Sequence, residues 1–234
     1  MHHFRAPDAR RFISASLMIG IAFVIFGASF GVLSVSAGAS VAQSCAMSLL
    51  VFTGASQMSA VSVLASGGTA ASAFGGAVLL SGRNAVYGLA MSPVLKQGSL
   101  ASRLLGAQWV IDETTAVVSA ETDPATRRTA FWISGAILYA SWNIGTLLGA
   151  LVGSSINPSD FGLDAAFPVM FTAMIAPHLR TSAGRKAALF GAVAAVALAP
   201  FMPIGLPILV SALGMLFGMS PTSSDLNVKT DGAP

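Results

Sequence analysis

The chain has 234 residues, of which 54% are hydrophobic and only 9% are charged, with a formal net charge of +3. An average soluble domain has about 25% charged residues, so a chain this apolar, with a mean hydropathy of +0.76, cannot cover itself in water. The composition therefore excludes a soluble enzyme, a nucleic-acid binder and a disordered chain, and it indicates a polytopic integral membrane protein.

Three long stretches of the chain contain no Asp, Glu, Lys or Arg, namely residues 12–82, 129–159 and 187–224. Apolar runs of about 18 residues or more are typical of membrane-spanning helices. The basic start of the chain resembles the beginning of a signal peptide. The apolar run behind it continues past Phe30, however, and is too long for the apolar core of a signal. We therefore interpret this run as the first membrane helix.

Glycine, proline and polar clusters divide these stretches into seven or eight predicted helical segments, which form one all-α transmembrane domain over residues 1–219. In chain order, the segments cover residues 12–37, 45–64, 70–95, 101–119, 129–152, 163–178, 186–199 and 204–219. The last three are shorter than the roughly 20 residues that a full span needs. The polar tail, residues 220–234, is predicted to be unstructured. The one cysteine, Cys45, permits no internal disulfide.

Two sets of residues echo each other at an offset of about half the chain: Gly27, Gly31 and Phe52-Thr53, and then Gly145, Gly149 and Phe171-Thr172. Glycines four residues apart lie on one helix face, where they usually serve close packing of membrane helices. The echo predicts two four-segment pseudo-repeats, as in many secondary transporters. A chance similarity of a few residues is the alternative.

Lysine and arginine lie at the ends of the apolar segments, where they set the orientation of a membrane protein. If all eight segments span and the N-terminus is cytoplasmic, nine of the twelve basic residues lie inside. If segments two and six re-enter the membrane instead, the count is the same. The first topology makes the two halves parallel and the second makes them inverted. Both place the N-terminus, the 180–186 loop and the C-terminus in the cytoplasm.

Three ionisable residues fall at membrane depth, where such groups are costly and mark candidate functional sites. Arg83 lies in the middle of segment three, and Asp112 and Glu113 lie inside segment four. Counted from the turn near Gly98, Arg83 lies about 23 Å and Asp112 about 20 Å deep, at about 1.5 Å per residue. We therefore expect the two to pair, which lowers the cost of burying both.

The pair has two interpretations, which the sequence leaves open. It either locks the hairpin or forms a site for a zwitterion, in which Arg83 faces a carboxylate and Asp112 or Glu113 faces an ammonium group or carries a proton. Asp112 and Glu113 are adjacent, so their side chains should point about 100° apart and have different partners. Asn84 and Tyr87 belong to the same candidate site, since Tyr87 shares a helix face with Arg83.

Segment two contains the run Phe52-Thr53-Gly54-Ala55-Ser56-Gln57. A glycine followed by small and hydroxyl residues at mid-membrane is consistent with a broken helix, whose freed backbone groups bind a polar ligand. We predict the break between Thr53 and Gln57, with Gly54, Ser56 and Gln57 in contact with substrate. The alternative is an unbroken helix with a small-residue packing face, in which Gln57 bonds to a neighbour.

Motifs for other chemistry are missing from the sequence. His178 stands at the end of segment six without a second His or Cys near it to complete a metal site. The sequence contains no phosphate-binding loop, zinc motif or nucleophile elbow. We therefore expect no cofactor, no metal and no ATPase.

Several stretches together resemble the AzlC-type family of bacterial branched-chain amino acid exporters, over roughly residues 15–215. They are Phe52 to Gln57, Arg83 to Tyr87 with Met91-Ser92-Pro93, Arg103 to Gly106 leading into Asp112 to Val117, and Gly162-Leu163-Asp164 with Phe167-Pro168. The family pattern around the arginine usually reads Asn-x-Arg-His. This chain has Ser81-Gly82-Arg83-Asn84 there, which leaves the substrate open.

The resemblance implies a secondary exporter of Leu, Ile, Val or analogues in a bacterial plasma membrane, driven by an ion gradient. It also implies a partner, a small and separately encoded AzlD-like membrane subunit. A carboxyl group in a low-dielectric site can load and release a proton near neutral pH, so Asp112 or Glu113 is the expected coupling group. The rival hypotheses are a non-transporting scaffold or assembly subunit with structural charges, and an intramembrane enzyme, for which no activated Ser or Cys is visible.

Overall fold

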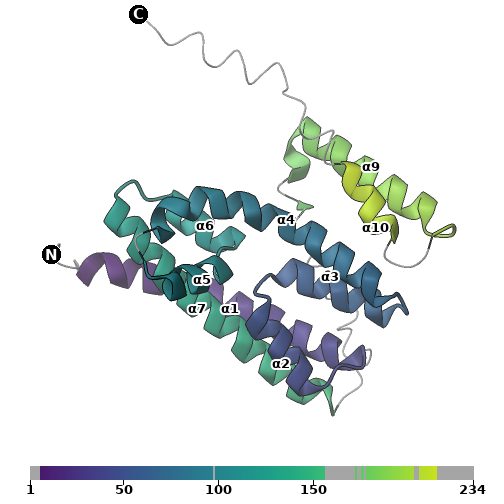
Figure 1. Cartoon of the computed structure of the whole chain (residues 1–234), viewed down its shortest axis with the longest axis horizontal. Helices are drawn as coiled ribbons and strands as arrows, with labels where there is room; N and C mark the ends of the chain where they lie inside the picture. Colours follow the sequence, from purple (N-terminus) through teal and green to yellow (C-terminus); the bar gives the residue numbers. More distant parts are fainter. Residues whose placement is uncertain are drawn as a thin grey trace, which may run out of the picture.

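The computed structural model describes residues 6–96, 98–155, 172, 175, 176, 178–202 and 206–214, and every regular element in them is helical (Figure 1). The elements are α1 (Ala6–Ser36), α2 (Val41–Leu50), α3 (Gly54–Ala65), α4 (Ala70–Leu95), α5 (Leu100–Gln108), α6 (Asp112–Ser119), α7 (Pro124–Gly153), α9 (Ser182–Leu198) and α10 (Leu206–Ser211), with 3-10 turns η3 (His178–Arg180) and η4 (Ala212–Gly214). The all-α prediction is confirmed for these residues.

Helices α1 and α7 lie side by side and form the most extensive helix pair among the described residues (Figure 1). Their backbones approach so closely that a Cβ atom at Gly149 would collide with the Ala28 carbonyl, and one at Gly31 with the Thr146 carbonyl. The glycines of predicted segments one and five therefore pack against each other. Phe171 lies outside the described residues, so the pseudo-repeat itself stays a prediction.

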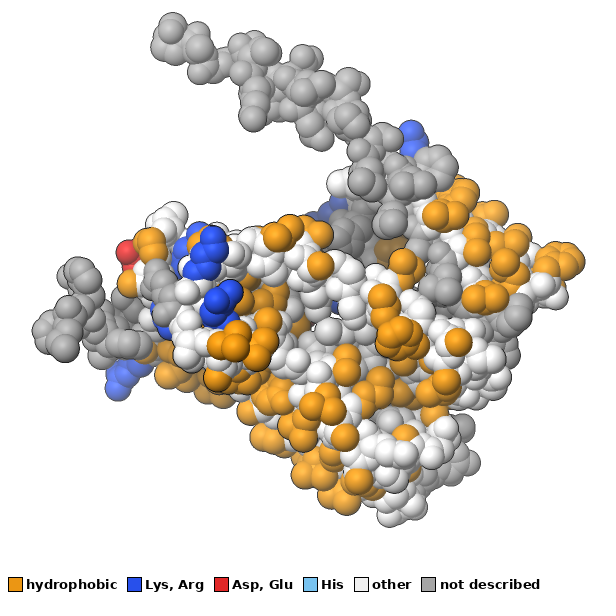
Figure 2. All heavy atoms as spheres, viewed as in Figure 1, with side chains coloured by type: hydrophobic (Ala, Val, Ile, Leu, Met, Phe, Trp, Pro, Cys, Tyr) orange, Lys and Arg blue, Asp and Glu red, His pale blue; other side chains and the backbone are white. Residues whose placement is uncertain are grey.

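The distribution of side chains is inverted relative to that of a soluble protein. Helix α1 exposes Met18 and Ile21 at 74% and 65% of their surface, while it buries Ser16 and Ser34. In the view of Figure 2, hydrophobic atoms cover much of the surface between two groups of Lys and Arg. Small polar residues at helix contacts and large apolar residues outside are expected when the surrounding solvent is lipid.

Two of the described helices are long and apolar enough to cross a membrane, over residues 9–36 of α1 and 124–153 of α7. The predicted total of seven or eight segments stays a prediction, as does the choice between spanning and re-entrant segments. Predicted segment six, residues 163–178, lies largely outside the described residues. Predicted segment eight is described only over α10 and η4.

The helix of predicted segment two is interrupted at residues 51–53, between α2 and α3. The interruption precedes Gly54, whereas the sequence placed it between Thr53 and Gln57. Side chains from other helices satisfy the carbonyl of Leu49 at the end of α2, which accepts hydrogen bonds from the Tyr139 hydroxyl (2.8 Å) and the Gln108 amide (3.0 Å). The break is therefore held by tertiary contacts with α5 and α7.

Predicted segment four is also interrupted, and the expectation of one helix over residues 101–119 is wrong. The chain leaves helical geometry at residues 109–111, between α5 and α6. The Thr114 hydroxyl holds this second break, because it accepts a hydrogen bond from the Ile111 N–H (3.1 Å) and donates one to the Trp109 carbonyl (2.8 Å). Asp112 and Glu113 consequently begin a helix instead of lying inside one, and a helix N-terminus stabilises negative charge.

Several of the other helices begin where side chains cap them. Predicted segment three coincides with α4, which follows the Thr69 cap. Helix α7 begins at Pro124, before the predicted residue 129, because Asp123 caps it by accepting a hydrogen bond from the Thr126 N–H (2.8 Å). Thr181 caps α9 in the same way. Capping residues of this kind satisfy backbone donors that the helix itself leaves free.

Candidate functional site

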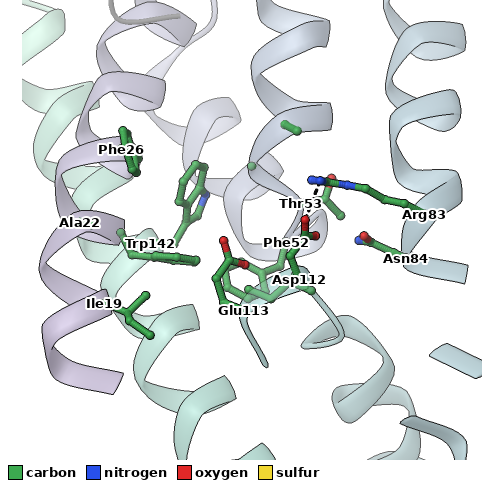
Figure 3. A pocket seen from close by; sticks show the side chains of 14 residues that line it. Ile19, Ala22, Phe26, Phe52, Thr53, Arg83, Asn84, Asp112, Glu113 and Trp142 are labelled. Carbon is green, nitrogen blue, oxygen red and sulfur yellow. Dashed lines mark hydrogen bonds and ion pairs between the residues drawn. The ribbon is translucent and has the colours of Figure 1, made fainter. Parts of the chain in front are cut away.

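A cavity of about 330 Å³ lies where the two helix breaks meet α1, α4 and α7 (Figure 3). It is lined by Ile19, Ala22, Phe23, Phe26, Phe52, Thr53, Gly54, Ala55, Arg83, Asn84, Ile111, Asp112, Glu113 and Trp142. Pockets that hold small ligands occupy about 300–1,000 Å³ and are mostly apolar with a few polar groups. This cavity meets both criteria, at the small end of the range.

The polar wall of the cavity contains the ion pair that the sequence predicts. Arg83 of α4 donates a hydrogen bond from Nη1 to Oδ2 of Asp112, at the start of α6, over 2.7 Å. The two side chains are 34% and 35% exposed, so the pair borders the cavity instead of lying in the packed core. A ligand can therefore reach both charges.

Glu113 contributes a second carboxylate to this wall. Its side chain points toward the Trp142 side of the cavity, whereas that of Asp112 points toward Arg83 (Figure 3). The two adjacent acids thus diverge, as their spacing predicts. Among the described residues Glu113 has no ion-pair partner within salt-bridge distance. The wall therefore combines one positive and two negative groups when all three are ionised.

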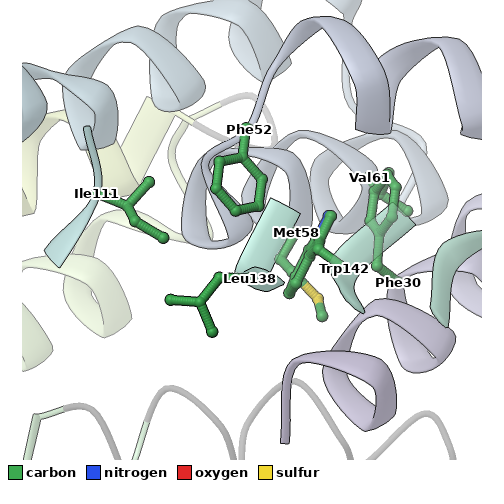
Figure 4. Close-up of a cluster of buried hydrophobic side chains, with 7 residues drawn as sticks. All are labelled: Phe30, Phe52, Met58, Val61, Ile111, Leu138 and Trp142. Atoms are coloured by element: carbon green, nitrogen blue, oxygen red, sulfur yellow. The ribbon is translucent and has the colours of Figure 1, made fainter. Parts of the chain in front are cut away.

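The opposite wall of the cavity is aromatic. Phe23 of α1 contacts the indole of Trp142 from α7, with ring centroids 5.9 Å apart, and Phe52 from the first break lies 6.3 Å from Phe23. Phe52 and Trp142 are also members of the buried cluster in Figure 4, with Phe30 stacked on the indole at 6.1 Å. The core thus holds these aromatic side chains in place.

Only some of the residues predicted to bind substrate line the cavity. Gly54, Arg83 and Asn84 line the cavity, but Ser56, Gln57 and Tyr87 do not. These three residues have contacts outside the cavity. Ser56 forms a hydrogen bond with Ser81 (2.8 Å), Gln57 donates one to the Met47 carbonyl (3.0 Å), and Tyr87 packs against a second buried cluster. Gln57 therefore satisfies a carbonyl of α2, as the packing alternative for this residue foresaw.

A family model described as AzlC protein matches residues 18–156, more than half of the chain. The chain belongs to the AzlC family. The inner membrane protein YgaZ of Escherichia coli is 29% identical to it over 206 residues, which cover 82% of this chain and 84% of that protein. A membrane protein of Helicobacter pylori is 26% identical over 210 residues, covering 86% of this chain and 90% of that protein. No solved structure matches the chain.

The AzlC match includes α1 to α7 almost entirely, and with them every residue that lines the cavity. The names of both relatives describe membrane proteins, in agreement with the exposed apolar and buried polar residues of this chain. This AzlC-family protein is therefore a membrane protein whose described helices surround a cavity with one charged and one aromatic wall.

Sequence reasoning missed the aromatic wall and Thr53 as parts of this AzlC-family cavity. Ala22, Phe23 and Phe26 recur at helical spacing on α1, a signal that equally fits a packing face. Trp142 lies far from the other lining residues in the sequence, and no local pattern links it to them. Trp109 packs against Gly135, Trp132 and Tyr139 and does not line the cavity. In the described part of the chain no group of three or more His, Cys, Asp or Glu could hold a metal.

Proposed function

We propose that this protein is a secondary exporter of branched-chain amino acids, Leu, Ile, Val or analogues, in the inner membrane of a bacterium. It is a multi-pass protein with its N-terminus in the cytoplasm, and it works with a small AzlD-like membrane subunit. The observation that carries the proposal is the cavity with a charged wall opposite an aromatic one. A branched-chain amino acid has the same two ends, a zwitterionic head and a compact apolar side chain.

The two helix breaks support a transport role. The backbone at residues 51–53 and 109–111 leaves helical geometry beside the cavity, and both breaks contribute lining residues. In membrane proteins irregular backbone is tolerated where it is enclosed by protein or lines a cavity, and it is a recurring feature of substrate sites in secondary transporters. The breaks are also places where a helix pair can bend as the site changes its access.

The acids of the polar wall support coupling to a proton gradient. Asp112 is already neutralised by Arg83 at 2.7 Å, whereas Glu113 faces the cavity without such a partner among the described residues. A carboxyl group in that position can take up a proton on one side of the membrane and release it on the other. Glu113 is thus the favoured coupling group of the two.

The competing proposal is a scaffold or assembly subunit that transports nothing. It is favoured by the same ion pair, because a bond between Arg83 and Asp112 also fixes α4 against α6. A scaffold needs no open cavity beside that pair, however, and no aromatic wall facing it. The scaffold proposal predicts no flux under any gradient.

Uptake of radiolabelled valine into inverted membrane vesicles tests the proposal, because export from the cell becomes uptake in this orientation. The protein is expressed with and without the small subunit, and the vesicles are energised with a proton gradient. We expect gradient-driven uptake, which Arg83→Gln abolishes. Arg103→Gln is the matched control, since Arg103 is exposed and does not line the cavity. A wild-type protein that takes up no valine with the subunit present supports the scaffold.

A further inference from the structure

The first turn of α3 opens onto the cavity. Thr53, Gly54 and Ala55 all line it, and α3 extends for 12 residues from Gly54. The first N–H groups of a helix have no partner within the helix. Thr53 occupies the capping position with extended backbone, but its side chain makes no capping hydrogen bond to them. Free backbone donors and the positive end of a helix dipole therefore lie at the cavity.

Two unpartnered side-chain groups stand beside this turn. The indole of Trp142 is 96% buried and lines the cavity, yet its Nε1–H has no hydrogen-bond partner among the described residues; the Thr53 hydroxyl has none either. The benzene edge of the indole contacts the turn, since a Cβ atom on Gly54 would lie 2.9 Å from its Cη2 atom. In Figure 3 its nitrogen edge is turned toward the side of the cavity where Thr53 lies. A buried donor without a partner costs about 1–3 kcal/mol, so these groups point to a ligand with acceptor oxygens.

The charges of the polar wall indicate which group of the ligand binds at the α3 turn. Arg83 is neutralised by Asp112 at 2.7 Å, and Glu113 adds a further negative charge. A carboxylate placed there meets two carboxylates for one guanidinium, whereas an ammonium group is attracted.

We propose that the first turn of α3, together with the Thr53 hydroxyl and the Trp142 indole N–H, is the subsite for the carboxylate of an α-amino acid, whose ammonium group faces the polar wall. The inference rests on the proposed function and deepens it. It replaces the sequence-based expectation that Arg83 holds the carboxylate, since Arg83 instead neutralises Asp112. Gly54 is suited to its position because any side chain there would contact the Trp142 ring.

Competition binding to the full-length protein, purified in detergent together with the small subunit, tests the subsite. Radiolabelled valine is displaced by unlabelled valine, by isobutylamine, which is valine without its carboxylate, and by 3-methylbutanoate, which is valine without its ammonium group. We expect isobutylamine to compete at least about 10-fold less well than valine, because it leaves the α3 donors unpaired.

Variants of Thr53 and Gly54 then show which groups of the subsite bind the carboxylate. Thr53→Val removes the hydroxyl and should weaken valine binding several-fold while leaving isobutylamine binding unchanged; Thr53→Ser is its control. Gly54→Ala and Gly54→Pro both add a Cβ atom toward Trp142, but only proline removes the backbone N–H, at a helix position that tolerates it. The proline variant should therefore bind valine more weakly than the alanine variant.

The outcomes separate the two proposals. If the wild-type protein binds valine, but isobutylamine competes equally well or Thr53→Val weakens both ligands alike, the α3 subsite is wrong and the exporter proposal stands. A wild-type protein that binds no valine overturns the exporter proposal and the subsite with it. The Thr53 variants decide the matter even when Gly54→Pro does not fold.

Discussion

Arg83 of α4 and Asp112 of α6 meet at 2.7 Å between two helices, and each side chain keeps about a third of its surface exposed. The pair therefore neutralises itself at the edge of a cavity, where it costs less than in a dry core. Its position also decides which neighbouring charge stays available to a ligand, since Glu113 is left beside a neutral pair.

Removing the cation of this pair should destabilise the protein. Arg83→Ala leaves the Asp112 carboxylate uncompensated, a change that costs about 3–5 kcal/mol in a fully buried pair. Because both side chains are about a third exposed, we expect about 1–3 kcal/mol here, reduced by solvent screening. Thermal unfolding of the purified protein measures the loss. The double variant Arg83→Ala/Asp112→Ala should recover part of it, and a single variant as stable as wild type contradicts the prediction.

The sequence predicts this pair because it requires only a count of residues on either side of one turn. The bounds of α4 follow likewise from local signals, the Thr69 cap at one end and Pro93 and Lys96 near the other. Features of this kind depend on residues close in the chain. They carry over directly from sequence to structure.

The break between α5 and α6 depends in part on a contact with a helix that is distant in the sequence. Trp109 packs against Gly135 of α7, and the Thr114 side chain closes the backbone behind it. The role of Gln57 is hidden for the same reason, because the carbonyl it satisfies belongs to α2. Residues whose function is to complete another helix cannot be told from substrate ligands by residue type alone.

The hydroxyl of Thr114 should be necessary for the second break. Thr114→Val keeps the shape of the side chain but leaves the Ile111 N–H and the Trp109 carbonyl without their partner, at a cost of about 1–3 kcal/mol. Thr115→Val is a matched control, because the Thr115 hydroxyl is buried without a partner among the described residues. Thermal unfolding should separate the two variants, and an equal effect of both would show that the Thr114 bonds do not hold the break.

The contact between α1 and α7 should tolerate no side chain at Gly149. A Cβ atom there collides with the carbonyl of Ala28, and overpacking of a close contact costs about 1–3 kcal/mol. Gly149→Ala should therefore lower the unfolding temperature in detergent. Gly88→Ala is the control on α4, since a Cβ atom at Gly88 meets nothing within 4 Å. If Gly149→Ala and Gly88→Ala have the same unfolding temperature, α1 and α7 move apart more easily than their close contact indicates.

Asp112 and Glu113 of the polar wall should have different roles in transport. Glu113→Gln removes the carboxyl group that faces the cavity without an ion-pair partner among the described residues. We expect this variant to lose export driven by a proton gradient but to retain exchange of internal for external valine, because exchange needs no net proton movement. Asp112→Asn instead leaves the Arg83 guanidinium uncompensated beside the cavity. It should impair both exchange and gradient-driven export.

Flux in proteoliposomes checks both variants, with counterflow of labelled valine as the measure of exchange and an imposed pH difference as the driving force. The amide in each variant keeps the size of the side chain, so a difference between them reflects charge and not packing. Normal export by both variants, with the normal dependence on the proton gradient, would make these acids structural and place the coupling elsewhere in the chain. The reverse division, exchange retained only by Asp112→Asn, would assign the coupling proton to Asp112 and leave Glu113 as the group that binds the substrate ammonium.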